Sequence, residues 1–217
     1  MPTPRSSPYI WVTWLSKLLS GEASCEWASW FKAHHERGSY SQMPSTFDQA
    51  AWQVNHTRLV SRVLDRFEGE GRSVSVEAQN QFTLIGRVAT VGGKPDIIAV
   101  SEDAVTVCDA KTGQPRISDQ VQVMAYMYAV PLAFSVYKGM SVGGLVIYED
   151  HEVAIPAEAV DEPFKTDMAA LIHKLSSDEP ARKVPSGPEC GFCDITAEDC
   201  TERIEGGDLH AGSTDDF

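Results

Sequence analysis

The sequence is poor in basic residues. Its 217 residues include 18 Lys and Arg but 31 Asp and Glu, which gives a formal net charge of −13 at pH 7. A protein that holds nucleic acid over a broad face needs an excess of positive charge there. The composition therefore predicts that any contact with a polyanion is confined to a narrow, salt-sensitive channel. An acidic docking surface for a protein partner, or a halotolerant host, would also account for the charge.

Other features are missing as well. No apolar run approaches the roughly 18 residues needed to cross a bilayer, so we expect no membrane span. The stretch "MPTPRSSPYIWVTWLSKLL" has three prolines before a short amphipathic segment and no convincing cleavage pattern, unlike a signal peptide. There is no GxxxxGK[ST] loop and hence no P-loop ATPase. We expect a cytoplasmic protein, or a viral protein acting in the host cytoplasm.

Two aspartates and a lysine surround one predicted hairpin. The Val- and Ile-rich runs 94–100 and 104–110 flank Ser101-Glu102-Asp103, a pattern typical of an antiparallel pair. If residues 101–104 form the turn, Asp96 stands opposite Asp109, and opposed side chains lie about 4.5–5.5 Å apart. Lys111 follows two residues after Asp109 and returns to the same face.

Two carboxylates this close repel each other unless a cation lies between them or one of them is protonated. Mg²⁺ or Mn²⁺ suits such oxygen ligands, and a lysine beside the ion could hold water and stabilise a phosphate. The pattern therefore indicates a site for phosphodiester hydrolysis. A surface hairpin with solvated Asp and Lys side chains is the alternative.

Two predicted helices flank this hairpin. Residues 117–130 place Gln122 and Tyr126 four residues apart, on one helical face. Residues 46–67 form an amphipathic helix with His56 one turn before its apolar stripe. His56 could be a third metal ligand, or a core histidine with a satisfied hydrogen bond.

The order His56, Pro95-Asp96, Asp109-x-Lys111, Gln122-x-x-x-Tyr126 resembles the PD-(D/E)xK nuclease superfamily, in particular its RecB/AddB-type branch. That branch includes standalone iron–sulfur exonucleases of CRISPR adaptation. The resemblance implies that His56, Asp96, Asp109 and the backbone carbonyl of Ala110 bind the metal. It also implies that Lys111 is catalytic, and that Gln122 and Tyr126 support the site and contact DNA.

Three of the five cysteines form a CxxC-x₆-C cluster: Cys190, Cys193 and Cys200. Iron–sulfur relatives have one cysteine before the nuclease core and three after it, so the resemblance implies Cys25 as the fourth ligand of a [4Fe–4S] cluster. By ligand type, structural zinc fits equally well, and His34, His35 or His210 could replace Cys25. Disulfides are a further alternative, although CxxC without a secretory signal favours metal. Cys108, inside a predicted strand, is read as a small buried hydrophobe.

Basic residues near the predicted site are few. Arg58, Arg62 and Arg66 recur every fourth residue along the His56 helix and could line a positive groove. Four others could add to that groove: Lys32, Arg37, Lys94 and Arg116. A solvated helix face is the alternative for the arginines.

The predicted architecture is an α/β fold with a restriction-endonuclease-like core, a central mixed sheet flanked by helices. We expect an N-terminal helical segment at 1–45, the nuclease core at 46–178, a linker and cysteine segment at 179–205, and an acidic disordered tail at 206–217. Within these segments, we predict helices at 9–20, 24–36, 46–68, 117–130 and 160–176 and strands at 73–79, 81–90, 94–100, 104–110, 144–149 and 151–155.

The sequence thus predicts a Mg²⁺- or Mn²⁺-dependent deoxyribonuclease, an exonuclease on single-stranded DNA ends, in recombination, repair or CRISPR adaptation. The alternatives are a non-cleaving DNA-end-binding or assembly subunit and a zinc-containing interaction module. An acidic surface for a protein partner fits each of them.

Overall fold

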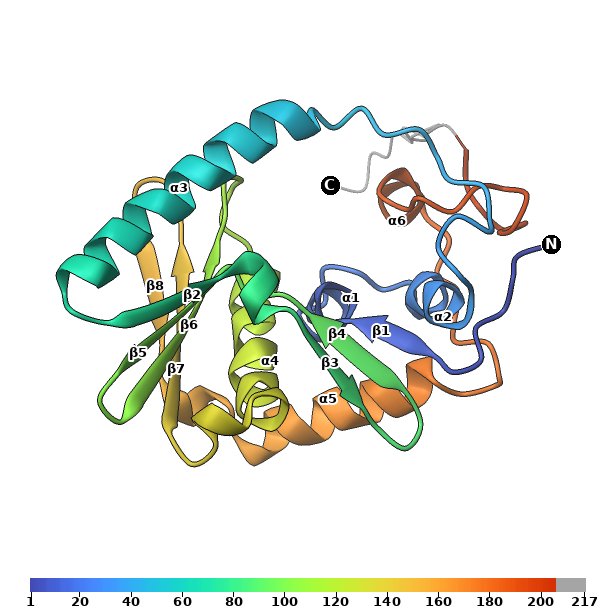
Figure 1. Ribbon diagram of the computed structural model, residues 1–217. Helices are drawn as coiled ribbons and strands as arrows, with labels where there is room; N and C mark the ends of the chain where they lie inside the picture. The colour runs from blue at the N-terminus through green and yellow to red at the C-terminus, as the bar shows by residue number, and fades with distance from the viewer. Residues whose placement is uncertain (206–217) are drawn as a thin grey trace, which may run out of the picture.

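The computed structural model describes residues 1–205 (Figure 1). The helices are α1 (Val12–Leu19), α2 (Glu26–His34), α3 (Gln49–Gly69), α4 (Ile117–Ala133), α5 (Glu162–Leu175) and α6 (Gly187–Gly191). The strands are β1 (Tyr9–Trp11), β2 (Ser73–Val76), β3 (Phe82–Ile85), β4 (Thr90–Gly93), β5 (Ile97–Ser101), β6 (Ala104–Ala110), β7 (Ser141–Ile147) and β8 (Glu152–Ile155). The predicted acidic tail lies outside the described residues.

The strands form two sheets. The larger has the order β2-β5-β6-β7-β8, in which β6 and β7 run parallel and the other neighbours antiparallel. The smaller has the order β1-β4-β3. The sheets are mixed and flanked by helices, which fits a restriction-endonuclease-like α/β core.

Helices cover both faces of the larger sheet (Figure 1). On one face the apolar stripe of α3 packs against β5 and β6, burying Leu59 and Phe67 with Ile97 and Cys108. On the other face α4 packs against β6 and β7. The largest of three hydrophobic clusters among the described residues forms there and includes Val123, Met127 and Val146.

Most of the predicted elements are present. The strand predicted at 104–110 has the same bounds as β6, and the helices predicted at 46–68 and 117–130 correspond to α3 and α4. The Asp48 side chain accepts a hydrogen bond from Ala51 N (2.9 Å) and so caps the start of α3. No helix among residues 1–205 is long and apolar enough to cross a membrane.

Three local predictions were wrong. The strand expected at 73–79 ends at Val76, and Glu77–Asn80 forms a short 3-10 helix. The segment 81–90 is not one strand but parts of β3 and β4, joined by a turn in which Gly86 N bonds to Ala89 O (2.9 Å). The helix expected from residue 9 begins only at Val12, because Tyr9–Trp11 pairs in parallel with β4. The N-terminal segment therefore contributes a strand as well as helices.

Candidate active site

The β5–β6 hairpin has the register expected from its sequence. Val100 pairs with Val105 and Ile97 with Cys108, so one residue further Asp96 stands across from Asp109. Their side chains are buried, with residue exposures of 8% and 3%. Two carboxylates are thus held side by side at the end of the hairpin, out of contact with bulk water.

Asp96 joins the hairpin to α3. Its Oδ2 accepts a hydrogen bond from Ala110 N (2.8 Å) and lies 3.1 Å from His56 Nε2. The His56 side chain is buried, and its Nδ1 has no hydrogen-bond partner among the described residues. His56 therefore reaches the site from α3, the helix that covers one face of the larger sheet.

Asp109 is linked to Lys111 and α4. Lys111 Nζ lies 2.6 Å from Asp109 Oδ2 and donates to Gln122 Oε1 (3.0 Å). Gln122 Nε2 donates to Asp109 Oδ1 (3.0 Å) and to the Tyr126 hydroxyl (3.2 Å). Both side chains are buried, with exposures of 7% for Gln122 and 3% for Tyr126.

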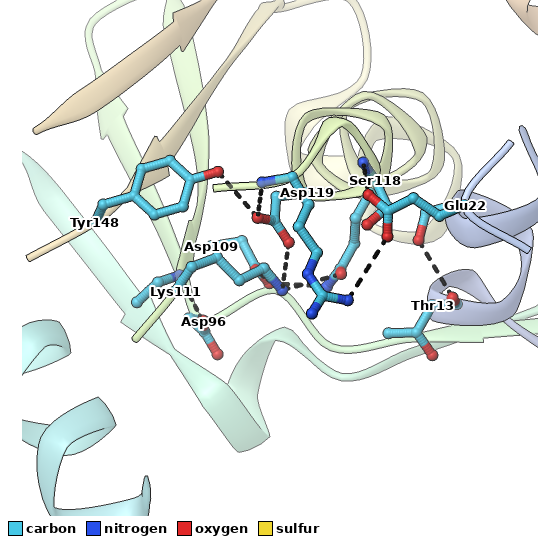
Figure 2. Close-up of polar contacts among 12 residues, drawn as sticks. Thr13, Glu22, Asp96, Asp109, Lys111, Ser118, Asp119 and Tyr148 are labelled. Carbon is cyan, nitrogen blue, oxygen red and sulfur yellow. Dashed lines mark hydrogen bonds and ion pairs between the residues drawn. The ribbon is translucent and has the colours of Figure 1, made fainter. Parts of the chain in front are cut away.

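A third carboxylate also faces Lys111 and was not identified in the sequence. Asp119 Oδ1 lies 3.9 Å from Lys111 Nζ, and its Oδ2 accepts hydrogen bonds from the Tyr148 hydroxyl (2.9 Å) and Arg116 N (3.0 Å) (Figure 2). The order β6–α4–β7 could have pointed to Asp119 in the sequence. Parallel strands joined by a helix bring their carboxyl ends to one edge of the sheet, where the helix begins. Lys111 and Tyr148 each directly follow one of these strands.

The electrostatics of the site follow from burial and crowding. Burial raises the pKa of Asp109 to about 6, and the Asp96 charge adds to this, while Lys111 opposes it. Burial also disfavours the charge on Lys111, but Asp109 outweighs it and the lysine pKa is raised. The hydrogen bond to Asp96 raises the pKa of His56. The site therefore holds an excess of negative charge.

The arginine stripe of α3 contacts the segment that joins β7 to β8. Arg58 Nη2 lies 3.1 Å from Glu149 Oε1, and Arg62 Nη1 donates to the Glu149 carbonyl (3.0 Å). Arg66 Nη1 lies 2.7 Å from Glu152 Oε1. The stripe therefore lies against Glu149 and Glu152, and Arg62 and Arg66 line a pocket of about 380 Å³ beside them.

A family model described as the PD-(D/E)XK nuclease superfamily matches residues 13–197, the segment that holds all of these side chains. The chain belongs to the PD-(D/E)XK nuclease superfamily. Membership implies a metal-dependent nuclease with DNA as substrate, and nucleases of this superfamily generally use Mg²⁺ or Mn²⁺.

Two further comparisons add little to this assignment. No curated protein matches this superfamily member. A solved structure described as "Crystal structure of SSO0001" is similar over 93% of this chain and 90% of that chain, with 17% identity and a TM-score of 0.45.

The donor set suits a hard divalent cation. The carboxylates of Asp96, Asp109 and Asp119 face one ammonium group, Lys111, and the His56 ring, which leaves the cluster net negative. The unpartnered Nδ1 of His56 is a further free donor. Oxygen-rich, negatively charged sites are those that Mg²⁺ and Mn²⁺ occupy, so these residues fit the ion that the superfamily implies.

The four predicted cluster cysteines line one cavity of about 720 Å³. Cys25 directly precedes α2, Cys190 lies in α6, and Cys193 and Cys200 follow it. His34 and His35 instead place ring nitrogens on Leu175 O (3.1 Å) and Phe31 O (2.8 Å). His210 lies outside the described residues.

Neither predicted metal site is complete as it stands. Among residues 1–205, no three His, Cys, Asp or Glu side chains lie close enough to form a metal-binding group. The iron–sulfur knuckle thus stays a prediction, as does the set His56, Asp96 and Asp109. Cys108 does not belong to either; it is fully buried in β6, and burial raises the pKa of its thiol.

Proposed function

We propose that this protein is a Mg²⁺- or Mn²⁺-dependent exodeoxyribonuclease that acts on single-stranded DNA ends. The observation that carries this proposal is the convergence of Asp96, Asp109 and Lys111 at one end of the β5–β6 hairpin. Gln122 joins Lys111 to Asp109 through two hydrogen bonds. Recombination, repair and CRISPR adaptation are the processes in which such an enzyme would act.

The roles follow from the chemistry of each group. Asp96, Asp109, His56 and the Ala110 carbonyl would hold the divalent ion, which when bound lowers the pKa of water and polarises the phosphate. Lys111 orients the attacking water and stabilises negative charge on the phosphate as the P–O ester bond breaks. The released oxygen takes up a proton, leaving a phosphate monoester and a hydroxyl group.

Gln122 and Tyr126 act as positioning residues. Gln122 fixes both Lys111 Nζ and Asp109 Oδ1, so the ammonium group and the carboxylate keep one geometry. The Tyr126 hydroxyl accepts the second hydrogen bond of the Gln122 amide (3.2 Å) and sets its orientation. Side chains held in this way lose little conformational freedom when substrate binds.

Lys111→Ala tests the mechanism directly. We expect cleavage of end-labelled single-stranded DNA in Mn²⁺ or Mg²⁺ to fall by at least about a hundredfold, the size of losing one charge-stabilising donor. The matched control is Lys165→Ala, which removes a half-buried lysine paired with Glu162 on α5 and should cleave like the parent. An anaerobically purified Lys111→Ala variant that folds and cleaves at the parent rate would contradict the proposal.

The second candidate function is a non-cleaving DNA-end-binding or assembly subunit. The net charge of −13 and the acidic partners of Arg58 and Arg66 favour it. If the parent protein cleaves neither single- nor double-stranded DNA with either metal, this candidate replaces the nuclease. The acidic surface would then be a docking face for a protein partner.

We also propose a [4Fe–4S] cluster on Cys25, Cys190, Cys193 and Cys200, with zinc as the alternative. Support comes from the single cavity that all four thiols line and from the preference of such clusters for four thiolates. Elemental analysis of iron, sulfide and zinc separates the two metals. Zinc without iron would favour an interaction module.

A further inference from the structure

The N-terminal end of α3 carries exposed apolar side chains beside the candidate active site. Every residue from Gln49 to Asn55 is exposed except Trp52, which is half-buried. Phe47, just before the helix, is 62% exposed, and Val54 is 69% exposed. In Figure 1 this end of α3 extends past the large sheet. Large apolar side chains gathered on a surface mark a contact site.

Two of these side chains are aromatic and lead to the catalytic carboxylates. The Trp52 ring stacks on the His56 ring, with centroids 4.7 Å apart and planes at 26°. The Phe47 ring lies 6.2 Å from that of Trp52, and His56 Nε2 binds Asp96. A row of rings therefore runs from the exposed Phe47 to the buried Asp96.

Charge alone supplies little attraction for a DNA strand here. Arg58 and Arg66 have acidic partners, and so do three other cations of the predicted groove. These pairs are Lys32–Asp194 (3.3 Å), Lys94–Glu77 (3.8 Å) and Arg116–Glu22 (3.9 Å). A cation with a carboxylate beside it presents less net charge to a phosphate, so binding needs a contribution that does not depend on charge.

We propose that Phe47 and Trp52 form a stacking platform for the unpaired bases of a DNA strand whose end enters the site. This inference rests on the proposed nuclease function and adds the means by which single strands are selected. Every base has a π-face, so stacking on aromatic side chains tolerates any sequence. Bases inside a duplex already stack on their neighbours and cannot reach the platform.

Binding measurements on variants of the Lys111→Ala protein test the proposal, because that background leaves the DNA intact. The probes are a labelled single strand of about twelve nucleotides, within the usual range of site sizes, and an abasic strand of equal length and charge. Trp52→Ala and Phe47→Ala should each weaken single-strand binding between about fivefold and a hundredfold. Trp52→Phe should restore most of the loss, and the affinity for the abasic strand should not change.

Using two alanine variants distinguishes a loss of base stacking from a disturbance of His56. Trp52→Ala removes a ring from His56, whereas Phe47→Ala changes only an exposed side chain. The slope of log affinity against log salt should stay constant in both, since no phosphate contact is lost. Unchanged single-strand affinity in both variants, or an equal loss on the abasic strand, would overturn the platform.

Failure of the platform and failure of the nuclease give different results. If the parent protein cleaves DNA and the variants bind single strands normally, the nuclease proposal stands and the platform is contradicted. A parent that binds single strands through Trp52 and Phe47 but cleaves nothing keeps the platform on a non-cleaving DNA-end-binding protein. If the parent protein binds the abasic strand as tightly as the natural strand, the platform is contradicted, whether or not the protein cleaves DNA.

Discussion

Asp109 is the most buried carboxylate of the site, and its protonation links metal binding to pH. Its raised pKa of about 6 exceeds its ordinary value of 3.8. Between these two values the folded protein holds a proton that the unfolded chain has already lost. The free energy of unfolding of the metal-free protein should therefore fall as the pH rises through this window. Above the window it should stay at the lower value.

Denaturant unfolding at several pH values measures this effect. Asp109→Asn should show a smaller decline in stability between about pH 4 and pH 7, because it has no carboxyl group to ionise. Mg²⁺ should stabilise the parent mainly above pH 6, where no proton has to be displaced. Equal pH profiles for the parent and Asp109→Asn would show that this carboxyl is not the titrating group.

How much of the site could be predicted depended on how local its contacts are. The register of Asp96 against Asp109 follows from a hairpin with a short turn and a period of two, so the sequence contained it. The pairing of Arg66 with Glu152 joins residues 86 apart, and no local pattern encodes it. Asp119 was also missed, because its partner Tyr148 lies 29 residues away and only the strand–helix–strand order of this region pointed to their meeting.

At the scale of elements, the close approach of β4 to α4 supports the site. A Cβ atom on Gly93 would lie 2.5 Å from Phe82 Cζ and 2.7 Å from Tyr126 Cε1. Phe82 and Tyr126 pack edge to face there, with centroids 6.1 Å apart. Only glycine leaves room for the Tyr126 ring to stand behind Gln122.

Gly93→Ala should therefore affect both stability and activity. We expect a loss of about 1–3 kcal/mol in the free energy of unfolding, the usual cost of overpacking, together with slower cleavage as Tyr126 moves. The matched control is Gly69→Ala at the end of α3, where an added Cβ meets no atom within 4 Å. Parent-like stability and cleavage in Gly93→Ala would show that the contact is loose.

At the element scale the sequence was informative wherever hydrophobic periodicity was strong. The amphipathic patterns of α3 and α4 predicted their positions and their buried faces. The parallel pairing of β1 with β4 could not be predicted, because it joins three residues near the N-terminus to a strand about 80 residues later. Nothing in the short segment Tyr9–Trp11 distinguishes a strand from the first turn of a helix.

At the scale of the whole molecule, the four cysteines that line one cavity come from opposite ends of the described chain. A cluster on all four thiols would close a loop that contains both the α3 and the α4 helices and the whole larger sheet, and such a link stabilises by restricting the unfolded chain. Cys190→Ser should remove the metal and its visible absorbance and lower the thermal midpoint. Cys108→Ser is the control, and it should keep the full metal content because Cys108 lies in β6, on the face covered by α3. Unchanged metal content in Cys190→Ser would contradict the ligand assignment.

The N-terminal helix α2 depends on contacts with residues near the C-terminus. Trp27 N donates to Arg182 O (3.0 Å), Trp30 Nε1 to Ser177 O (2.7 Å), and Ser24 N to Glu189 Oε1 (2.6 Å). On the ribosome α2 therefore emerges well before its partners, and at about 5–20 residues per second the delay is on the order of ten seconds. During that interval Trp27 and Phe31, later buried against Ile195, face water. The nascent chain should bind chaperones through α2 until residues 177–195 have emerged.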